Sequence, residues 1–245
     1  MRLEATAVQL RPRPMFEAAD LGVRLVQRCS GELLRTAGPV YAVCVLLALA
    51  LMPVAPWLPA LVLWWLKPWL DRTVLFVLSR SVFSRDTRPA DLWSGARSVW
   101  WQGLLGSLTL RRLSPWRTFT AAAVQLEGLQ GAALRKRKAQ LRQGHQGSAL
   151  ALSWGFWHLE TAICLGLPAL AVWLVPGDLS LAPLQWLSGA DDLRATLVFT
   201  GAYALAVAVV EPFFVGAGFA MYLNRRVELE AWDVEQSLRH AFAPA

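Results

Sequence analysis

Three long apolar runs constrain this chain more than any other feature of its sequence. They cover residues 39–58, 148–175 and 193–223. A helix needs about 20 mostly apolar residues to cross the hydrocarbon core of a bilayer. The composition agrees, because 56% of the 245 residues are hydrophobic and only 17% are charged. The runs therefore predict an integral membrane protein and not a soluble core.

A fourth run, residues 59–83, can span the bilayer only if Lys67, Asp71 and Arg72 are tolerated inside it. We count it as a span, because an odd number of spans would place the two basic flanks on opposite sides of the membrane. The predicted fold class is therefore an all-α integral membrane protein. It is a four-span helical bundle that forms a single membrane domain over residues 1–245, with cytoplasmic interfacial amphipathic helices.

The distribution of basic residues predicts the orientation. Residues 143–193 contain no lysine or arginine, whereas residues 134–142 contain five basic residues and no acid. Because basic loops stay in the cytoplasm, both termini are predicted to be cytoplasmic. The net charge of +7 is explained by this topology, so we predict the lipid bilayer as a partner and no nucleic acid.

Three further segments are predicted to be helical without spanning the bilayer. Residues 15–36 place apolar side chains on one face, which is typical of an interfacial helix. Residues 84–147 form a cytoplasmic connection, in which residues 98–110 are either re-entrant or interfacial. Residues 224–242 form an amphipathic acidic helix. The chain's own basic cluster and a partner subunit are alternative partners for it, and a solvated acidic face without a specific partner is the third alternative. The cytoplasmic docking candidates are Arg135, Lys136, Arg137, Lys138, Glu228, Glu230, Asp233 and Glu235.

Polar side chains from three predicted spans fall at a similar depth near the middle of the bilayer. A lone charge there costs several kcal/mol, so such residues are expected to face the bundle interior and to pair. Pairing of Lys67 or Arg72 with Glu211 or Glu160 would fix the helix register, whereas a proton or substrate path is the functional alternative. The predicted buried polar cluster is Lys67, Asp71, Arg72, His158, Glu160 and Glu211.

The last predicted span also carries small residues at four-residue spacing. Such a stripe lets another helix approach closely. Because Glu211 lies next to this stripe, its carboxylate is predicted to point into a helix contact and not toward lipid. The predicted helix-packing stripe is Ala204, Ala208, Pro212, Gly216 and Ala220.

Motifs of nucleotide, metal and hydrolase sites are missing from the sequence. It contains no GxxxxGK[ST], HExxH, GxSxG or GxGxxG pattern, and its three cysteines show no CxxC spacing. His158 and Glu160 are two residues apart, which places them on different faces of a helix. We therefore predict a protein without enzymatic activity, without a cofactor and without a metal.

Three sequence blocks carry a family resemblance: KPWLDRTVLFVLSRSVF, RRLSPWRTF with QLEGLQG, and EPFFVGAGFAMYLNRRVELEAWDVEQSLR. They resemble a family of uncharacterised proteobacterial inner-membrane proteins encoded near MoxR-type AAA+ ATPases and von Willebrand A-type proteins. DLWSGAR after a proline-containing span is similar to membrane domains associated with some glycerophosphodiester phosphodiesterases, which bears on fold alone.

The resemblance implies a role in an envelope-associated complex, with an AAA+ ATPase or a von Willebrand A-type protein as partner. The predicted function is a non-enzymatic inner-membrane protein that docks partner proteins through residues 15–36, 111–147 and 224–242. A small transporter or lipid-handling protein that uses the polar midplane cluster is the alternative. The sequence leaves the oligomeric state open, with a homo-oligomer among the alternatives.

Overall fold

A computed structural model of the chain describes residues 12–83, 86–101, 114–174 and 193–230. Every regular element in these ranges is a helix. They are α1 (Met15–Arg28), α2 (Ser30–Ala50), α3 (Leu58–Ser81), α4 (Pro89–Ser94), the π-helix η2 (Arg97–Trp101), α6 (Arg117–Gln125), α7 (Gly131–Arg142), α8 (Gln146–Leu174) and α10 (Leu193–Glu230).

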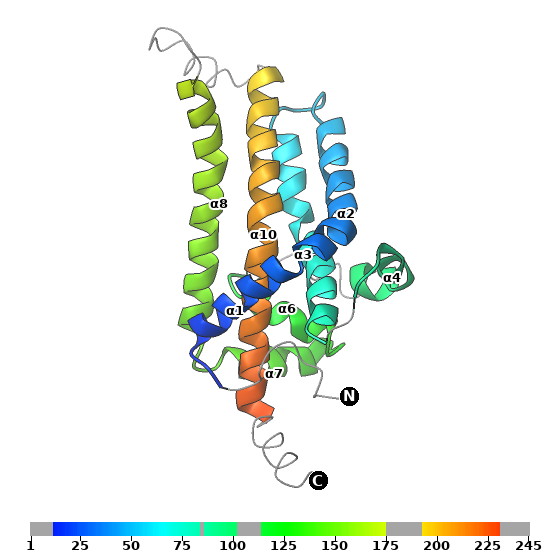
Figure 1. The fold of residues 1–245 in the computed structure, drawn as a ribbon, viewed down its shortest axis with the longest axis vertical. Coiled ribbons are helices and arrows are strands. Elements are labelled where there is room, and N and C mark those ends of the chain that lie inside the picture. Colours follow the sequence, from blue (N-terminus) through cyan, green and yellow to red (C-terminus); the bar gives the residue numbers. More distant parts are fainter. Residues whose placement is uncertain (1–11, 84–85, 102–113, 175–192, 231–245) are drawn as a thin grey trace.

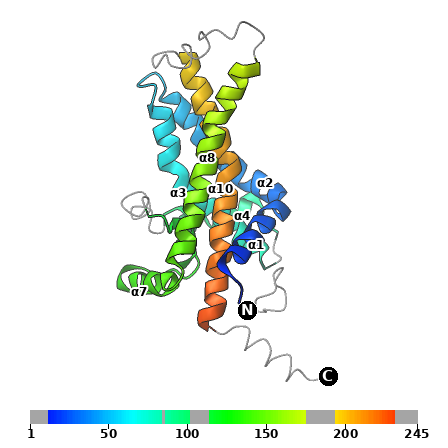
Figure 2. The same cartoon turned by 90° about the vertical axis from the view of Figure 1, so that its left-hand side faces the viewer.

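Four long helices, α2, α3, α8 and α10, run side by side, and α10 is the central one (Figures 1 and 2). One face of α10 packs against α3, which also packs against α2, and another packs against α8. The short helices α1 and α6 cross α10 at the end of the bundle that also carries α7. The charged residues in the middle of three long helices are thereby held at one level of one bundle.

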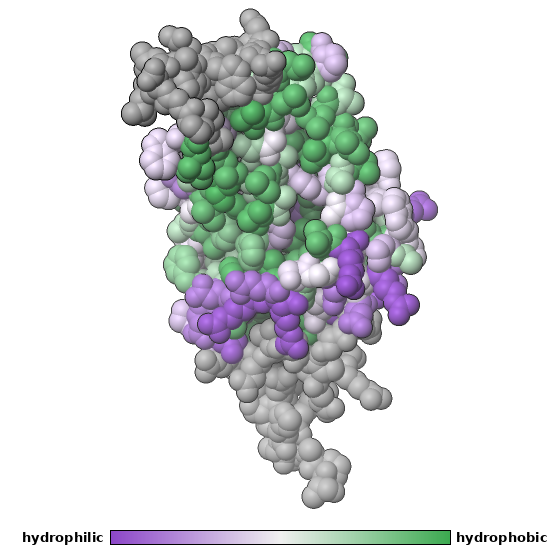
Figure 3. All heavy atoms as spheres, turned by 45° about the horizontal axis from the view of Figure 1, so that its top comes forward, coloured by the Kyte–Doolittle hydropathy of each residue, from purple (hydrophilic) through white to green (hydrophobic). Residues whose placement is uncertain are grey.

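Large apolar side chains cover the outside of the long helices. Leu46 and Leu47 on α2 are 66% and 55% exposed, and Trp154 and Leu165 on α8 are 63% and 58% exposed. Figure 3 shows this apolar surface above a band of hydrophilic residues. Soluble monomers rarely expose apolar patches of more than a few hundred Å². The surface is therefore that of a membrane protein.

Three described helices are long and apolar enough to cross a membrane: Ser30–Ala50, Gln146–Leu170 and Ala195–Glu230. α3 is not among them, because Lys67, Asp71 and Arg72 lower the hydropathy of its central part. The all-helical membrane fold predicted from the sequence is thus found with three candidate spans.

The segment predicted as one interfacial helix, residues 15–36, is divided between two helices in the structure. α1 ends at Arg28, and α2 begins at Ser30 and continues to Ala50. The apolar face of α1 packs against α10, whereas Phe16 is 56% exposed. The prediction of one continuous helix is therefore corrected, and the buried residues of α1 recur at helical spacing because they meet another helix. These residues are Met15, Ala18, Ala19, Gly22, Leu25 and Val26.

The span predicted over residues 39–58 is corrected, because α2 begins at Ser30 and ends at Ala50, before the turn that contains Pro53 and Pro56. The span predicted over residues 59–83 is α3, and the one predicted over residues 148–175 is α8, each within two residues at both ends. The separate acidic helix predicted from residue 224 instead continues α10 as far as Glu230. Pairing of Arg226 with Glu230 one turn later supports the helix beyond the apolar run. Residues 231–242 of that prediction lie outside the described residues.

The connection predicted over residues 84–147 contains helices that pack into the bundle. Residues 98–101 of the segment predicted as re-entrant or interfacial belong to η2, which packs against α3, and residues 102–110 lie outside the described ranges. α6 buries five residues, mainly against α10. This nine-residue helix places its first side chain, Arg117, at the level of the charged residues of the long helices.

Candidate functional site

Five charged side chains from four helices meet in the middle of the bundle and form what we call the ion cluster. Lys67 Nζ lies 2.5 Å from Glu160 Oε2 and 2.7 Å from Glu211 Oε2. Arg117 donates from Nη1 to Asp71 at 2.8 Å and from Nη2 to Glu211. Glu211 therefore joins the two cations, and the five groups form one continuous chain from Glu160 to Asp71.

Each member of the ion cluster is largely withdrawn from the surface. The side chains of Lys67 and Glu211 are 5% and 4% exposed, that of Asp71 is 9%, and those of Glu160 and Arg117 are 14% and 19%. A buried charge is tolerated only when it is paired and hydrogen-bonded. The arrangement satisfies this condition for Lys67, Arg117 and Glu211, each of which has two charged partners.

Arg117 is the member of the ion cluster that the sequence analysis missed. It lies in the connection that was predicted to be cytoplasmic, after a short run without the length of a span. The charge count of the predicted cluster gave a signal, since two cations faced three carboxylates and a further cation was needed. α6 supplies it because Phe119, Ala122 and Ala123 bury one face of this helix in the core.

Two predicted members of the buried polar cluster lie elsewhere. Arg72 is buried, but its Nη1 donates to the carbonyl oxygens of Val99 and Trp100 in η2, at 3.3 and 3.4 Å. His158 is exposed on the outside of α8, with its Nδ1 2.9 Å from the Trp154 carbonyl oxygen. The prediction for His158 is corrected: it faces away from the side of α8 that carries Glu160.

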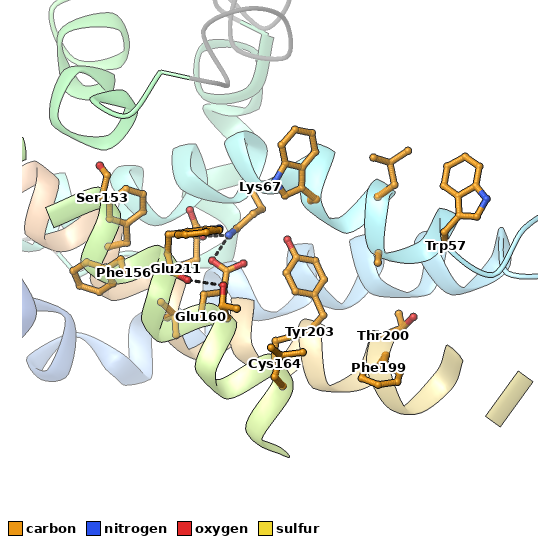
Figure 4. A pocket seen from close by; sticks show the side chains of 18 of the residues that line it. Trp57, Lys67, Ser153, Phe156, Glu160, Cys164, Phe199, Thr200, Tyr203 and Glu211 are labelled. Atoms are coloured by element: carbon orange, nitrogen blue, oxygen red, sulfur yellow. Dashed lines mark hydrogen bonds and ion pairs between the residues drawn. The ribbon is translucent and has the colours of Figure 1, made fainter. Parts of the chain in front are cut away.

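A large cavity, which we call the lateral cavity, lies between α3 and α8 with α10 behind it (Figure 4). Its volume is about 1350 Å³, and it extends from Trp57 at one end of α3 to Ser153 near the start of α8. Lys67 and Glu160 point toward one another across it. Four of the five members of the ion cluster line it: Lys67, Arg117, Glu160 and Glu211.

The remaining wall of the lateral cavity is mainly apolar and rich in aromatic rings. α8 packs against α10, α3 packs against α2 and α10, and the space between α3 and α8 stays open. Trp57 and Trp157 line the cavity and are nevertheless 64% and 60% exposed. The cavity therefore opens sideways, at the apolar surface of the bundle.

The predicted helix-packing stripe on α10 has more than one neighbour. Gly216 packs against α1, where a Cβ on Gly216 would lie 2.9 Å from the Gly22 carbonyl oxygen. Ala204 packs in a cluster with Ala48 of α2 and Leu63 of α3. Ala208 is exposed, while Pro212 and Ala220 are half-buried. The stripe thus serves two separate helix contacts, and Ala208 is corrected to a surface position.

Pairs between α7 and the end of α10 use part of the predicted docking set. Arg137 binds Glu127 through two nitrogens, with Nε 2.9 Å from Oε2, and its Nη2 lies 2.5 Å from Glu230 Oε1. The hydrogen bonds that Arg137 donates to Glu127 raise the pKa of the Arg137 guanidinium above its ordinary value. Glu228 pairs with Arg225 at 2.8 Å. One acid of the C-terminal segment, Glu230, therefore meets the chain's own basic cluster through Arg137, which was one of the alternatives.

The other docking candidates divide between exposed and undescribed positions. Arg135 and Lys136 are exposed on α7 and form no ion pair within the described ranges. Lys138 is half-buried on the same helix. Asp233 and Glu235 lie outside the described residues. The part of the basic cluster that remains accessible is thus Arg135 and Lys136.

Comparison with protein-family models, with curated proteins and with solved structures found no match to this chain. The family resemblance given above therefore stays a prediction. Within the described ranges, no three His, Cys, Asp or Glu side chains are arranged to hold a metal ion. The function has to be argued from the ion cluster and the lateral cavity.

Proposed function

We propose that this chain is a lipid-handling membrane protein that binds an amphiphilic molecule in the lateral cavity. The observation that carries the proposal is a sideways-open cavity with aromatic walls and four charged side chains at one level. Of the two functions considered from the sequence, the lipid-handling alternative fits this geometry better than partner docking.

The lateral cavity has both apolar and charged walls, which favours a ligand with an apolar part and a polar part. Apolar walls bind an apolar group, and a few placed polar groups orient it. Charged groups next to a lipid-facing opening would be costly unless something polar met them. The volume of about 1350 Å³ exceeds the range of about 300–1,000 Å³ typical of small-molecule sites. An amphiphile of lipid size satisfies all of these conditions.

We also propose a four-span topology in a bacterial inner membrane, with both termini in the cytoplasm. α3 is the fourth span in this topology. Its 24 residues run beside α2 and α10, and its charged groups are turned into the bundle. The basic residues of α7 and the pair Arg225 and Arg226 lie at one end of the bundle (Figure 1). Basic residues mark the cytoplasmic end of spans, which supports this orientation.

Filling the lateral cavity should remove the bound amphiphile. Thr161 lines the cavity from α8, so Thr161→Trp should reduce co-purifying lipid per protein at least about threefold, because the indole occupies the space of an acyl chain. The measurement is quantitative mass spectrometry of lipid extracted from protein purified in a mild detergent.

The neighbouring residue supplies the control for this experiment. Ala162 is exposed on α8 and does not line the lateral cavity. Ala162→Trp should leave the retained lipid unchanged. Equal lipid retention by both variants, with both well folded, would remove the proposal of a binding cavity.

Docking of a cytoplasmic partner is a second candidate function, favoured by the accessible basic pair on α7. Arg135→Glu combined with Lys136→Glu should leave thermal stability within about 0.5 kcal/mol of wild type, since both side chains are exposed. It should abolish recovery of an AAA+ ATPase or von Willebrand A-type partner in affinity purification from native membranes.

Arg137→Gln is the matched comparison, because this residue lies on the same helix but is internally paired. It should lower the stability by about 1.5–3 kcal/mol, the range for hydrogen bonds to charged groups. If the exposed double variant keeps its partner, or if wild type yields no such partner, the docking candidate is wrong.

A further inference from the structure

We propose that the ligand of the lateral cavity carries a positively charged group, of the ammonium class, that binds the Glu160 carboxylate. This inference rests on the proposed amphiphile-binding function and assigns the charge of the ligand. It starts from Glu160, which stands at one end of the ion cluster and on the wall of the lateral cavity.

Of the two carboxylates that line the lateral cavity, Glu160 is the one with room for a further partner. Its Oε2 accepts from Lys67, and among the described residues no other group donates to this side chain. Its side chain is 14% exposed, lies on the cavity wall and forms the end of the ion chain. Glu211, by contrast, is 4% exposed and already accepts from both Lys67 and Arg117. A cation entering the cavity therefore meets Glu160 as its acceptor.

The two cations of the cluster are poor sites for an anionic ligand. Lys67 is held by Glu160 and Glu211, and Arg117 is held by Asp71 and Glu211. A phosphate or carboxylate could bind either cation only by displacing a carboxylate, which would then be left buried and unpaired. The electrostatics of the cavity thus select against a negative headgroup.

The aromatic lining supports the same assignment. Phe156 and Trp157 lie one turn before Glu160 on α8, and Trp64 lies one turn before Lys67 on α3, so all three flank the charged level of the cavity. Cations bind over aromatic faces, and quaternary ammonium groups are recognised by sites of this kind. A carboxylate among aromatic rings in a membrane cavity is suited to a lipophilic cation.

Two probe ions of the same size and shape but opposite charge can test the proposal. The full chain, in nanodiscs of neutral lipid, is equilibrated with tetraphenylphosphonium or with tetraphenylborate, and empty nanodiscs give the background partitioning. The expected result is saturable binding of tetraphenylphosphonium with one site per chain and no saturable binding of tetraphenylborate. Saturable binding of the anion alone, or equal binding of both ions, would overturn the proposal.

Variants of Glu160 locate the site. Glu160→Gln should weaken tetraphenylphosphonium binding at least about tenfold, because it removes the charge that the ligand pairs with. Glu160→Asp keeps the carboxylate and should restore binding to within about threefold of wild type, which separates loss of charge from loss of fold. Unchanged affinity in a folded Glu160→Gln protein would contradict the assignment to this residue.

The lipid measurement with Thr161→Trp distinguishes failure of this inference from failure of the proposed function. If Thr161→Trp removes co-purifying lipid but the wild-type protein binds no cation, the cavity still binds an amphiphile and the assigned charge is wrong. If the lipid measurement also shows no difference from Ala162→Trp, the proposed function itself fails.

Discussion

Replacing Lys67 by methionine is expected to lower the free energy of unfolding by about 3–5 kcal/mol, the cost of removing one partner from a buried ion pair. Lys67 is 5% exposed and is the cation that both Glu160 and Glu211 share. Its loss leaves three carboxylates with Arg117 as the remaining cation of the cluster. Methionine keeps the length of the side chain, so the effect reports charge and not volume.

Glu211→Gln should cost less, although Glu211 is the most buried carboxylate of the cluster. Its removal leaves Lys67 with Glu160 and Arg117 with Asp71, which are two complete pairs at 2.5 and 2.8 Å. The expected loss is about 1.5–3 kcal/mol, since hydrogen bonds to charged groups disappear but no charge is left unpaired. The order of the two single variants therefore tests the connectivity of the cluster, and not merely its presence.

The double variant Lys67→Met with Glu211→Gln should be more stable than the sum of the single effects predicts, by about 1–3 kcal/mol. Equilibrium unfolding in mixed micelles gives the three free energies. Glu17→Gln is the control, because the Glu17 side chain, which pairs with Arg13, is 46% exposed. Its replacement should change the free energy of unfolding by less than about 1 kcal/mol. Additive single effects, or a larger loss in Glu211→Gln than in Lys67→Met, would disprove the arrangement.

The sequence was sufficient to predict that the four long apolar runs are helical, but it placed both ends well only for α3 and α8, since α2 begins nine residues before the predicted span. Residues 148–175 and 59–83 were predicted to within two residues of α8 and α3, because a bilayer fixes the length of an apolar helix. The helix predicted over residues 15–36 ends at Arg28, and its apolar face was predicted only in part, because Ala19 and Val26 are buried against α10 but Phe16 is exposed. A periodic apolar face shows what is buried and not whether lipid or another helix covers it.

The ion cluster was predicted in part, for a related reason. Depth along a span could be counted from the sequence, so Lys67, Glu160 and Glu211 were expected at the same level. Rotation about a helix axis could not be fixed in the same way, so His158 lies on the outside of α8, and Arg72, although buried as predicted, donates to η2. Arg117 enters through a tertiary contact of α6, which no local pattern specifies.

The lateral cavity could not be predicted, because it depends on two helices that do not pack together. α3 and α8 each pack against α10, and the space between them follows from the angles of these two contacts. Many of its lining residues are aromatic or small and would suit a packed core equally well. Only the three-dimensional arrangement shows that they surround an open volume next to the ion cluster.

Adding a single methyl group at Gly22 is expected to cost about 3 kcal/mol, the upper part of the range for overpacking in a core. A Cβ on Gly22 would lie 2.8 Å from the Ala217 Cα atom and closer still to the Gly216 carbonyl group. Both neighbours are backbone atoms of α10, so no side chain can rotate to relieve the clash. Gly22→Ala must therefore move α1 away from α10 and uncover part of the buried face of α1.

Gly31→Ala is the matched control, since no described atom lies within 4 Å of the position that its Cβ would take. This change should leave stability unchanged or raise it by up to about 1 kcal/mol, because alanine favours a helix over glycine.

Separation of α1 from α10 in Gly22→Ala should also expose Cys29, which is 6% exposed at the end of α1. Maleimide labelling of Cys29, with Cys44 and Cys164 replaced by alanine, should be faster in Gly22→Ala than in Gly31→Ala. Equal stabilities and equal labelling rates would show that α1 does not pack on α10 in this way. α1 would then be free to lie in the membrane interface, as its amphipathic sequence alone predicts.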